Sequence, residues 1–122
     1  VYDVLHQAEL THYLNTQPEA FDAVVSADTL CYFGALDGAL AAARRSLRSG
    51  GWLIFTVEAL NSDDMRAHRL QTNGRYAHGE RYVEAALAQA RFDAIAIEPQ
   101  TLRQEAGEPV RGWLCVSRKS PA

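Results

Sequence analysis

The chain has no glycine-rich turn of the kind that opens most ligand-binding doubly wound domains. Its one pair of adjacent glycines, Gly50 and Gly51, follows a helix-patterned segment instead of preceding one. Cysteine is also scarce: Cys31 and Cys115 are the only two in 122 residues, and both lie in apolar segments far apart in sequence. We expect both to be reduced, buried and inert. A catalytic thiol at Cys31 is the less favoured interpretation because no activating histidine is suggested nearby.

Long apolar runs and an excess of positive charge are missing as well. No run approaches the roughly 20 apolar residues that span a bilayer, and no N-terminal signal pattern is present, so we expect a cytoplasmic protein with no membrane partner. The formal net charge is −3, which gives no electrostatic reason to expect nucleic acid. The four histidines show no ligand spacing, and no metal site is inferred. The length and the ordinary 48% apolar content predict a single domain over residues 1–122.

The most informative stretch runs from Phe21 to Glu58 and has the pattern strand, helix, strand. Its two strands, Asp22–Ala27 and Trp52–Glu58, are apolar almost throughout, which is typical of the middle of a parallel sheet with helices on both faces. Residues 34–49 supply the helical crossover that a parallel pair requires. Gly50-Gly51 is expected to end that helix as a C-cap.

The remaining elements are shorter or less regular. An extended segment at Asp3–Ala8 is followed by the central unit, and Asn61-Ser62-Asp63-Asp64 reads as the start of a further helix, on which His68 would lie at the surface. A helix from about Gly79 to Arg91 leads to two closing strands. These strands, Asp93–Leu102 and Val110–Arg118, form an expected hairpin around a Glu105–Pro109 loop.

Three segments together resemble a known family: FDAVVSADTLCYF, LRSGGWLIFTVE and the closing hairpin. They are similar to the carboxyl-terminal part of class I S-adenosylmethionine-dependent methyltransferases, and most of all to bacterial predicted methyltransferases that carry tetratricopeptide repeats. In that family a Leu-Arg-x-Gly-Gly turn leads into the fifth strand, and Leu47–Gly51 matches it.

The resemblance implies an α/β fold: a partial, Rossmann-like methyltransferase sheet, mostly parallel, with a closing antiparallel hairpin. It starts at a third strand, Asp3–Ala8, and lacks the first strands and the glycine-rich cofactor turn. The implied cofactor is S-adenosyl-L-methionine, with weak or absent binding by this chain alone.

The resemblance also places cofactor-binding residues. Ala8, Glu9 and Leu10 lie where the family follows its third strand with an acidic residue that accepts from the adenine amino group. A carboxylate suits this role because the amino group only donates. The alternative for Glu9 is a surface carboxylate at the end of a strand, and both interpretations stay open.

Ser26, Ala27 and Asp28 would lie beside the methionine part of the cofactor and the methyl acceptor. Asp28 ends a strand on the side of the sheet where ligands bind in open α/β folds. Its carboxylate is a candidate catalytic group that offsets sulfonium charge or accepts the acceptor's proton. A helix-capping or turn aspartate is the alternative.

Three more residues are candidates for the acceptor side: Glu58, Tyr76 and His78. Glu58 ends the next strand, and either lines the acceptor pocket or begins a loop. Tyr76 and His78 follow the Asn73-Gly74 break and would form a lid, with His78 as a catalytic base near neutral pH. A solvated loop histidine is the alternative.

The favoured function is methyl transfer to a small-molecule or protein acceptor by a longer parent protein, with this chain alone inactive. The rival is a non-enzymatic dimerisation module derived from a methyltransferase half-domain, which self-associates through an exposed sheet edge. A Rossmann-like reductase is a third option, but the antiparallel closing hairpin disfavours it.

Overall fold

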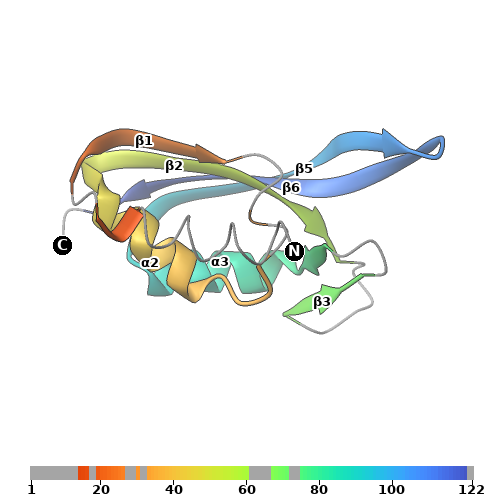
Figure 1. Cartoon of the computed structure of the whole chain (residues 1–122), viewed down its shortest axis with the longest axis horizontal. Coiled ribbons are helices and arrows are strands. Elements are labelled where there is room, and N and C mark those ends of the chain that lie inside the picture. The colour runs from red at the N-terminus through yellow and green to blue at the C-terminus, as the bar shows by residue number, and fades with distance from the viewer. Residues whose placement is uncertain are drawn as a thin grey trace.

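The computed structural model describes residues 14–16, 19–26, 30, 33–60, 67–71 and 75–120. Within these ranges, two helices lie on the same face of a six-stranded sheet (Figure 1). The helices are α2 (Asp37–Ser46) and α3 (Glu80–Gln89), and the strands are β1 (Phe21–Ser26), β2 (Leu47–Ala59), β3 (His68–Leu70), β4 (Tyr76–His78), β5 (Phe92–Glu105) and β6 (Glu108–Lys119).

The long strand β2 organises the sheet. It pairs in parallel with β1, where Val24 lies opposite Leu53, and antiparallel with β6 along its other edge. Near its end β2 also pairs in parallel with β4, so β1 and β4 follow one another along the same edge of β2. β3 pairs antiparallel with β4, and β5 pairs antiparallel with β6. The predicted strand–helix–strand unit and the closing antiparallel hairpin are therefore confirmed.

The core lies between this sheet and the two helices. Side chains alternate across a strand, and Leu53, Phe55 and Val57 of β2 are buried while Trp52 is 41% exposed. The helices contribute Leu40 from α2 and Leu87 from α3, both fully buried. We expected helices on both faces of β2; the two described helices cover one face only, and Trp52 points away from the core.

The predicted C-cap at Gly50-Gly51 is wrong. α2 ends at Ser46, and Leu47 already belongs to β2. Gly50 has a φ of +78°, which glycine adopts without strain. A Cβ on Gly51 would lie 2.9 Å from the Arg48 carbonyl oxygen and 3.0 Å from that of Asp22. The glycines thus allow a close approach between β2 and β1 instead of ending a helix.

Two further boundaries differ from the prediction. His68 lies in strand β3 and not on a helix, because the chain here pairs with β4. The closing strands are longer than expected and leave only Ala106 and Gly107 as the turn, with φ values of +51° and +80°. Positive φ at both central residues is the geometry that matches the twist of a tight hairpin. Asp3–Ala8 and the expected helix start at residues 61–64 lie outside the described residues.

Candidate active site

Several predicted site residues lie at the carboxyl ends of the strands β1, β2 and β4. Ser26 is the last residue of β1, Glu58 precedes the last residue of β2, and His78 is the last residue of β4. Because β1 and β4 both run parallel to β2, these ends lie on the same side of the sheet. We call this region the carboxyl edge. Open α/β sheets bind their ligands on this side.

His78 is fully buried at the carboxyl edge. Its Nε2 lies 3.0 Å from the carbonyl oxygen of Gly34, an acceptor, so Nε2 carries the ring proton. Burial lowers the pKa of His78 to about 4, and the ring is neutral at pH 7. Its Nδ1 has no hydrogen-bond partner among the described residues. The interpretation of His78 as a solvated loop histidine is wrong. His78 lies in β4, which pairs with β2, and its ring is buried against the backbone of Gly34.

An aromatic group surrounds His78. The His68 ring lies edge-on to Tyr76 at 5.7 Å and to Tyr82 at 5.6 Å between ring centroids, and the Tyr82 and His78 rings are stacked at 6.2 Å. A Cβ on Gly34 would lie 3.0 Å from the Tyr76 ring and 3.1 Å from the His68 ring. Gly34 therefore lets the loop before α2 come close to β3 and β4. Tyr76 and His68 are half-buried, so this group reaches the surface.

Tyr82 is held in place by its hydroxyl. The oxygen accepts a hydrogen bond from the Leu36 backbone amide at 2.9 Å and lies 3.4 Å from a carboxylate oxygen of Asp37. Burial is the main cause that raises the pKa of Tyr82. This bridge fixes the start of α2 against α3 and leaves the stacked rings little freedom.

Glu58 lies in an ion-pair network at the end of β2, and its side chain is only 5% exposed. It accepts from Gln71 at 2.8 Å, from Arg75 at 3.4 Å and from Arg103. Both arginines also pair with Glu105, at 2.8 Å and 2.7 Å. Glu58 thus lies within β2 and begins no loop. Its carboxylate connects β2 to β5 through Arg103 and to the segment between β3 and β4 through Arg75.

Two buried polar atoms at the carboxyl edge bear on whether a polar ligand fits there. Ser26 Oγ is buried and has no partner among the residues that the structure describes. A hydroxyl left without a partner costs free energy unless a ligand or water satisfies it. Ser26 Oγ and His78 Nδ1 are two such atoms, and both fit a polar ligand at the carboxyl edge. The predicted residues Ala8, Glu9, Leu10, Ala27 and Asp28 lie outside the described residues, as does Cys31.

Sequence reasoning missed His68 and Tyr82. The sequence predicts His68 on the surface of a helix, and it places Tyr82 within the helix from about Gly79 to Arg91 without a role in the site. Their meeting depends on the β3–β4 pairing, for which two three-residue strands give almost no periodic signal. The partners of Glu58 were missed for a related reason: Arg103 is 45 residues away, and no spacing rule connects the two.

Other features of the described residues are simpler. Cys115 is buried, as predicted, and burial raises the pKa of its thiol to about 12, which leaves it unreactive. Across the described ranges, no helix is long and apolar enough to cross a membrane.

These elements define the class of fold, because the chain superposes on solved S-adenosylmethionine-dependent methyltransferases. A methyltransferase of this kind from Methanosarcina mazei superposes with a TM-score of 0.69 at 16% identity, over 87% of this chain and 62% of the other. Phosphoethanolamine N-methyltransferase 2 from Haemonchus contortus, solved with S-adenosyl-L-methionine, gives 0.63 at 14% identity, over 86% and 34%. The 1,6-didemethyltoxoflavin-N1-methyltransferase of Burkholderia thailandensis gives 0.61 at 19%, over 84% and 45%.

A family model agrees with this class. Residues 3–55 match the model described as a methyltransferase domain. The predicted resemblance to class I methyltransferases is thereby confirmed, both by the family model and by the fold. The chain spans less than two thirds of the length of these three solved structures. A search of curated proteins found no match.

Proposed function

We propose that this chain serves in S-adenosylmethionine-dependent methyl transfer as part of a longer protein, to a small-molecule or protein acceptor. The observation that carries the proposal is the carboxyl edge, where two buried polar atoms, Ser26 Oγ and His78 Nδ1, have no partner among the described residues. The methyltransferase fold and the match over residues 3–55 support it.

The residues divide into two groups. Ser26, Ala27 and Asp28 would hold the methionine part of the cofactor, and the segment Ala8-Glu9-Leu10 its adenine. When bound, S-adenosylmethionine supplies a methyl group already activated on a sulfonium, so the protein has to hold, orient and exclude water. The hydroxyl of Ser26 can donate to a carboxylate or accept from an ammonium.

Tyr76 and His78 face the acceptor side in this proposal, and Glu58 supports them by fixing the end of β2. If the methyl acceptor loses a proton in the reaction, a basic group of the protein has to take that proton up. Asp28 takes this role where its carboxylate is ionised. His78, neutral at pH 7 with an open Nδ1, is the second candidate and also positions the Tyr82 ring against which it stacks.

The organisation proposed with this function is a single, cytoplasmic methyltransferase portion over residues 1–122. The resemblance to bacterial proteins with tetratricopeptide repeats belongs to the same proposal. So does the expectation that this chain alone binds the cofactor weakly or not at all.

The test is isothermal titration with S-adenosylhomocysteine. Two proteins are compared: the 122-residue chain and a version carrying about a hundred further upstream residues from its coding sequence, a length set by the size of a typical domain. We expect binding by the longer protein alone, weakened several-fold by Ser26→Ala, since a hydrogen bond contributes about 1 kcal/mol. Ser49→Ala, at the opposite end of β2, is the matched control. Absence of binding by both proteins rejects the proposal, and equal binding by both rejects the expectation that the short chain binds the cofactor weakly or not at all.

A second candidate function is self-association without catalysis. On β1, Val25 is 70% exposed, and among the described strands β1 pairs only with β2. An exposed apolar strand edge can pair with another chain. Sedimentation velocity decides: a dimer that Val25→Lys dissociates supports this candidate, and a monomer at high concentration rejects it.

A further inference from the structure

The amino ends of β1 and β2, opposite the carboxyl edge, carry a concentration of positive charge. Six of the twelve lysines and arginines of the chain lie here, and we call this group the basic end. Among the residues that the structure describes, three acidic ones accompany them: Glu19, Asp22 and Asp93. The cationic residues of the basic end are Arg44, Arg45, Arg48, Arg91, Arg118 and Lys119. The net charge of the chain is −3, whereas the described residues at this end carry a net positive charge.

Two of these cations, Lys119 and Arg44, donate hydrogen bonds to backbone carbonyl oxygens near the ends of helices. Lys119, 9% exposed, donates from Nζ to the Leu47 carbonyl oxygen at 2.6 Å, just beyond the carboxyl end of α2. Arg44 donates to the carbonyl oxygens of Arg91 and Ser120 at 3.4 Å and 3.2 Å, close to the carboxyl end of α3. Cations at these positions complement the helix dipoles. They account for part of the charge, but not for Arg45, Arg48 and Arg118.

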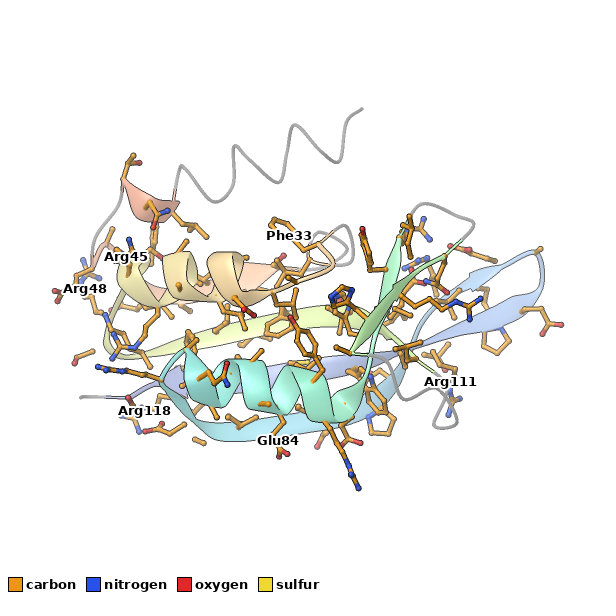
Figure 2. The ribbon with its side chains drawn as sticks, turned by 90° about the horizontal axis from the view of Figure 1, so that it is seen from below. Phe33, Arg45, Arg48, Glu84, Arg111 and Arg118 are labelled. Carbon is orange, nitrogen blue, oxygen red and sulfur yellow. The ribbon has the colours of Figure 1, made fainter. Side chains whose placement is uncertain are left out.

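Arg45, Arg48 and Arg118 are exposed, and Figure 2 shows all three at the same end of the molecule, with Arg111 at the other end. The Arg45 side chain has no hydrogen-bond or ion-pair partner among the described residues. Arg48 pairs with Asp22 at 3.1 Å, but both side chains are more than half exposed, at 54% and 86%. Such a pair is weak and open to exchange with another carboxylate.

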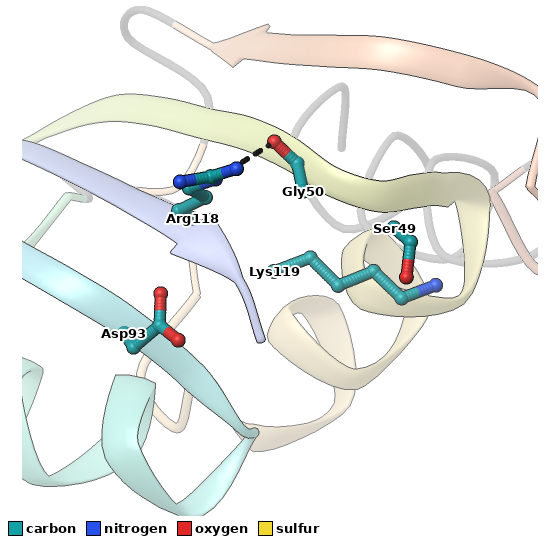
Figure 3. Close-up of a pocket in the computed structure, with 5 residues that line it drawn as sticks. All are labelled: Ser49, Gly50, Asp93, Arg118 and Lys119. Carbon is teal, nitrogen blue, oxygen red and sulfur yellow. Dashed lines mark hydrogen bonds between the residues drawn. The ribbon is translucent and has the colours of Figure 1, made fainter. Parts of the chain in front are cut away.

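Arg118 is held in a fixed position beside a hollow. Its Nε donates to the Gly50 carbonyl oxygen at 3.2 Å, and its guanidinium lies over the exposed Trp52 ring, 5.7 Å from the centroid. A cavity of about 330 Å³ opens next to it, and Figure 3 shows the lining side chains. The cavity is lined by Ser49, Gly50, Asp93, Arg118 and Lys119. A pre-positioned guanidinium loses little entropy when it binds a carboxylate.

We propose that the basic end is a docking surface for an acidic segment of a partner protein, with one carboxylate side chain of that segment in the cavity against Arg118. Arginine and tryptophan are the residue types most enriched at protein–protein hot spots, and here they are stacked on each other. A nucleic acid fits less well, because Glu19, Asp22 and Asp93 interrupt the positive surface that a continuous phosphate track needs. The site lies away from the carboxyl edge, so docking leaves cofactor binding free.

The probe is a synthetic octaglutamate peptide, titrated at 50 mM and 500 mM NaCl while the combined fluorescence of the two tryptophans, Trp52 and Trp113, is followed. We expect binding at low salt that weakens strongly at high salt. Arg45→Gln should weaken it about threefold, and Arg118→Gln about tenfold or more, since a hydrogen-bonded charge contributes more. Arg45 is exposed, and its side chain makes no hydrogen bond or ion pair with the described residues, so its variant keeps the test valid if Arg118→Gln is unstable. Arg111→Gln, at the far end of the β5–β6 hairpin arm, is the matched control and should bind like the parent.

Four outcomes overturn the proposal. They are no binding at 50 mM NaCl, equal weakening by Arg45→Gln and Arg111→Gln, tighter binding of a single-stranded 12-nucleotide DNA than of the peptide, and occupation of the surface by a second copy. The last would appear in sedimentation as a dimer that Arg45→Gln dissociates. Titration with S-adenosylhomocysteine is independent of all four, so failure here does not touch the proposed methyl transfer.

Discussion

At the scale of single residues, His78 shows how a buried polar group is tolerated. Its ring is 0% exposed, donates one hydrogen bond to Gly34, and stacks on Tyr82. Its main-chain oxygen accepts from Trp113 Nε1 at 3.0 Å. Burial disfavours the charged imidazolium, so the fold holds the ring in its neutral form. Because the ring is held neutral, the protein loses unfolding free energy when the solution becomes acidic.

This gives a prediction on pH. The pKa of His78 is about 4 in the folded protein and 6.5 in its unperturbed state, so between these values the unfolded chain binds more protons. Stability is therefore fully present above pH 6.5 and decreases as the pH falls toward 4. Between pH 7 and pH 5 we expect His78 to account for a loss of about 2 kcal/mol in unfolding free energy.

Urea unfolding at the two pH values checks this prediction. His78→Phe keeps an aromatic ring but has no titrating group. Between pH 7 and pH 5 the unfolding free energy of this variant should therefore fall by about 2 kcal/mol less than that of the parent. His68→Phe is the matched control: it leaves His78 in place and should retain the parent's loss in acid. If His78→Phe loses as much stability in acid as the parent, the neutral buried ring is not the cause.

At the scale of elements, the ion-pair network around Glu58 joins parts of the chain that are far apart in sequence. Glu58 lies in β2, Arg75 precedes β4, and Arg103 and Glu105 lie in β5. The two carboxylates and two guanidiniums are close to neutral as a set, which reduces the cost of burying Glu58. Hydrogen bonds from Arg103 and then Arg75 lower the pKa of Glu105.

The carboxylates of this network should contribute unequally. Glu58→Gln removes a buried charge that three groups donate to, and leaves the two arginines facing each other with one counter-charge. We expect it to lower the unfolding free energy by about 1–3 kcal/mol, because each arginine is still about a quarter exposed and partly solvated. Glu105→Gln, on a side chain that is 40% exposed, is the control and should cost much less. Urea unfolding of both variants at pH 7 gives the comparison, and equal losses would show that burial does not set the contribution of Glu58.

At the scale of the whole molecule, local signals predicted the centre of the fold and distant pairing decided the rest. The apolar strands at β1 and β2 and the helical spacing in α2 are readable in sequence because each is a periodic pattern of adequate length. β3 and β4 are three residues each and exist through pairing with one another and with the end of β2. The same applies to the candidate site. The family resemblance predicts Ser26, the end of a strand predicts Glu58, and the break at Asn73-Gly74 predicts His78. His68 and Tyr82 join them only through the β3–β4 pairing.

The topology also predicts how stability is distributed. Leu53, Ile54 and Phe55 of β2 lie opposite β1 on one edge and β6 on the other, so their amides open only when the sheet comes apart. Among the described strands β3 pairs with β4 alone, and the residues of β3 are half-buried or exposed. Native-state hydrogen exchange should therefore show protection near the full unfolding free energy, on the order of 5 kcal/mol or more, at Leu53–Phe55. It should be far lower at the β3 amides, which open locally. Exchange measured by NMR across a urea series separates the two cases, because only the β2 amides should follow global unfolding. Equal protection in β3 and β2 would mean that the Glu58 network and the aromatic group around His78 bind β3 and β4 into the same cooperative unit as the central sheet.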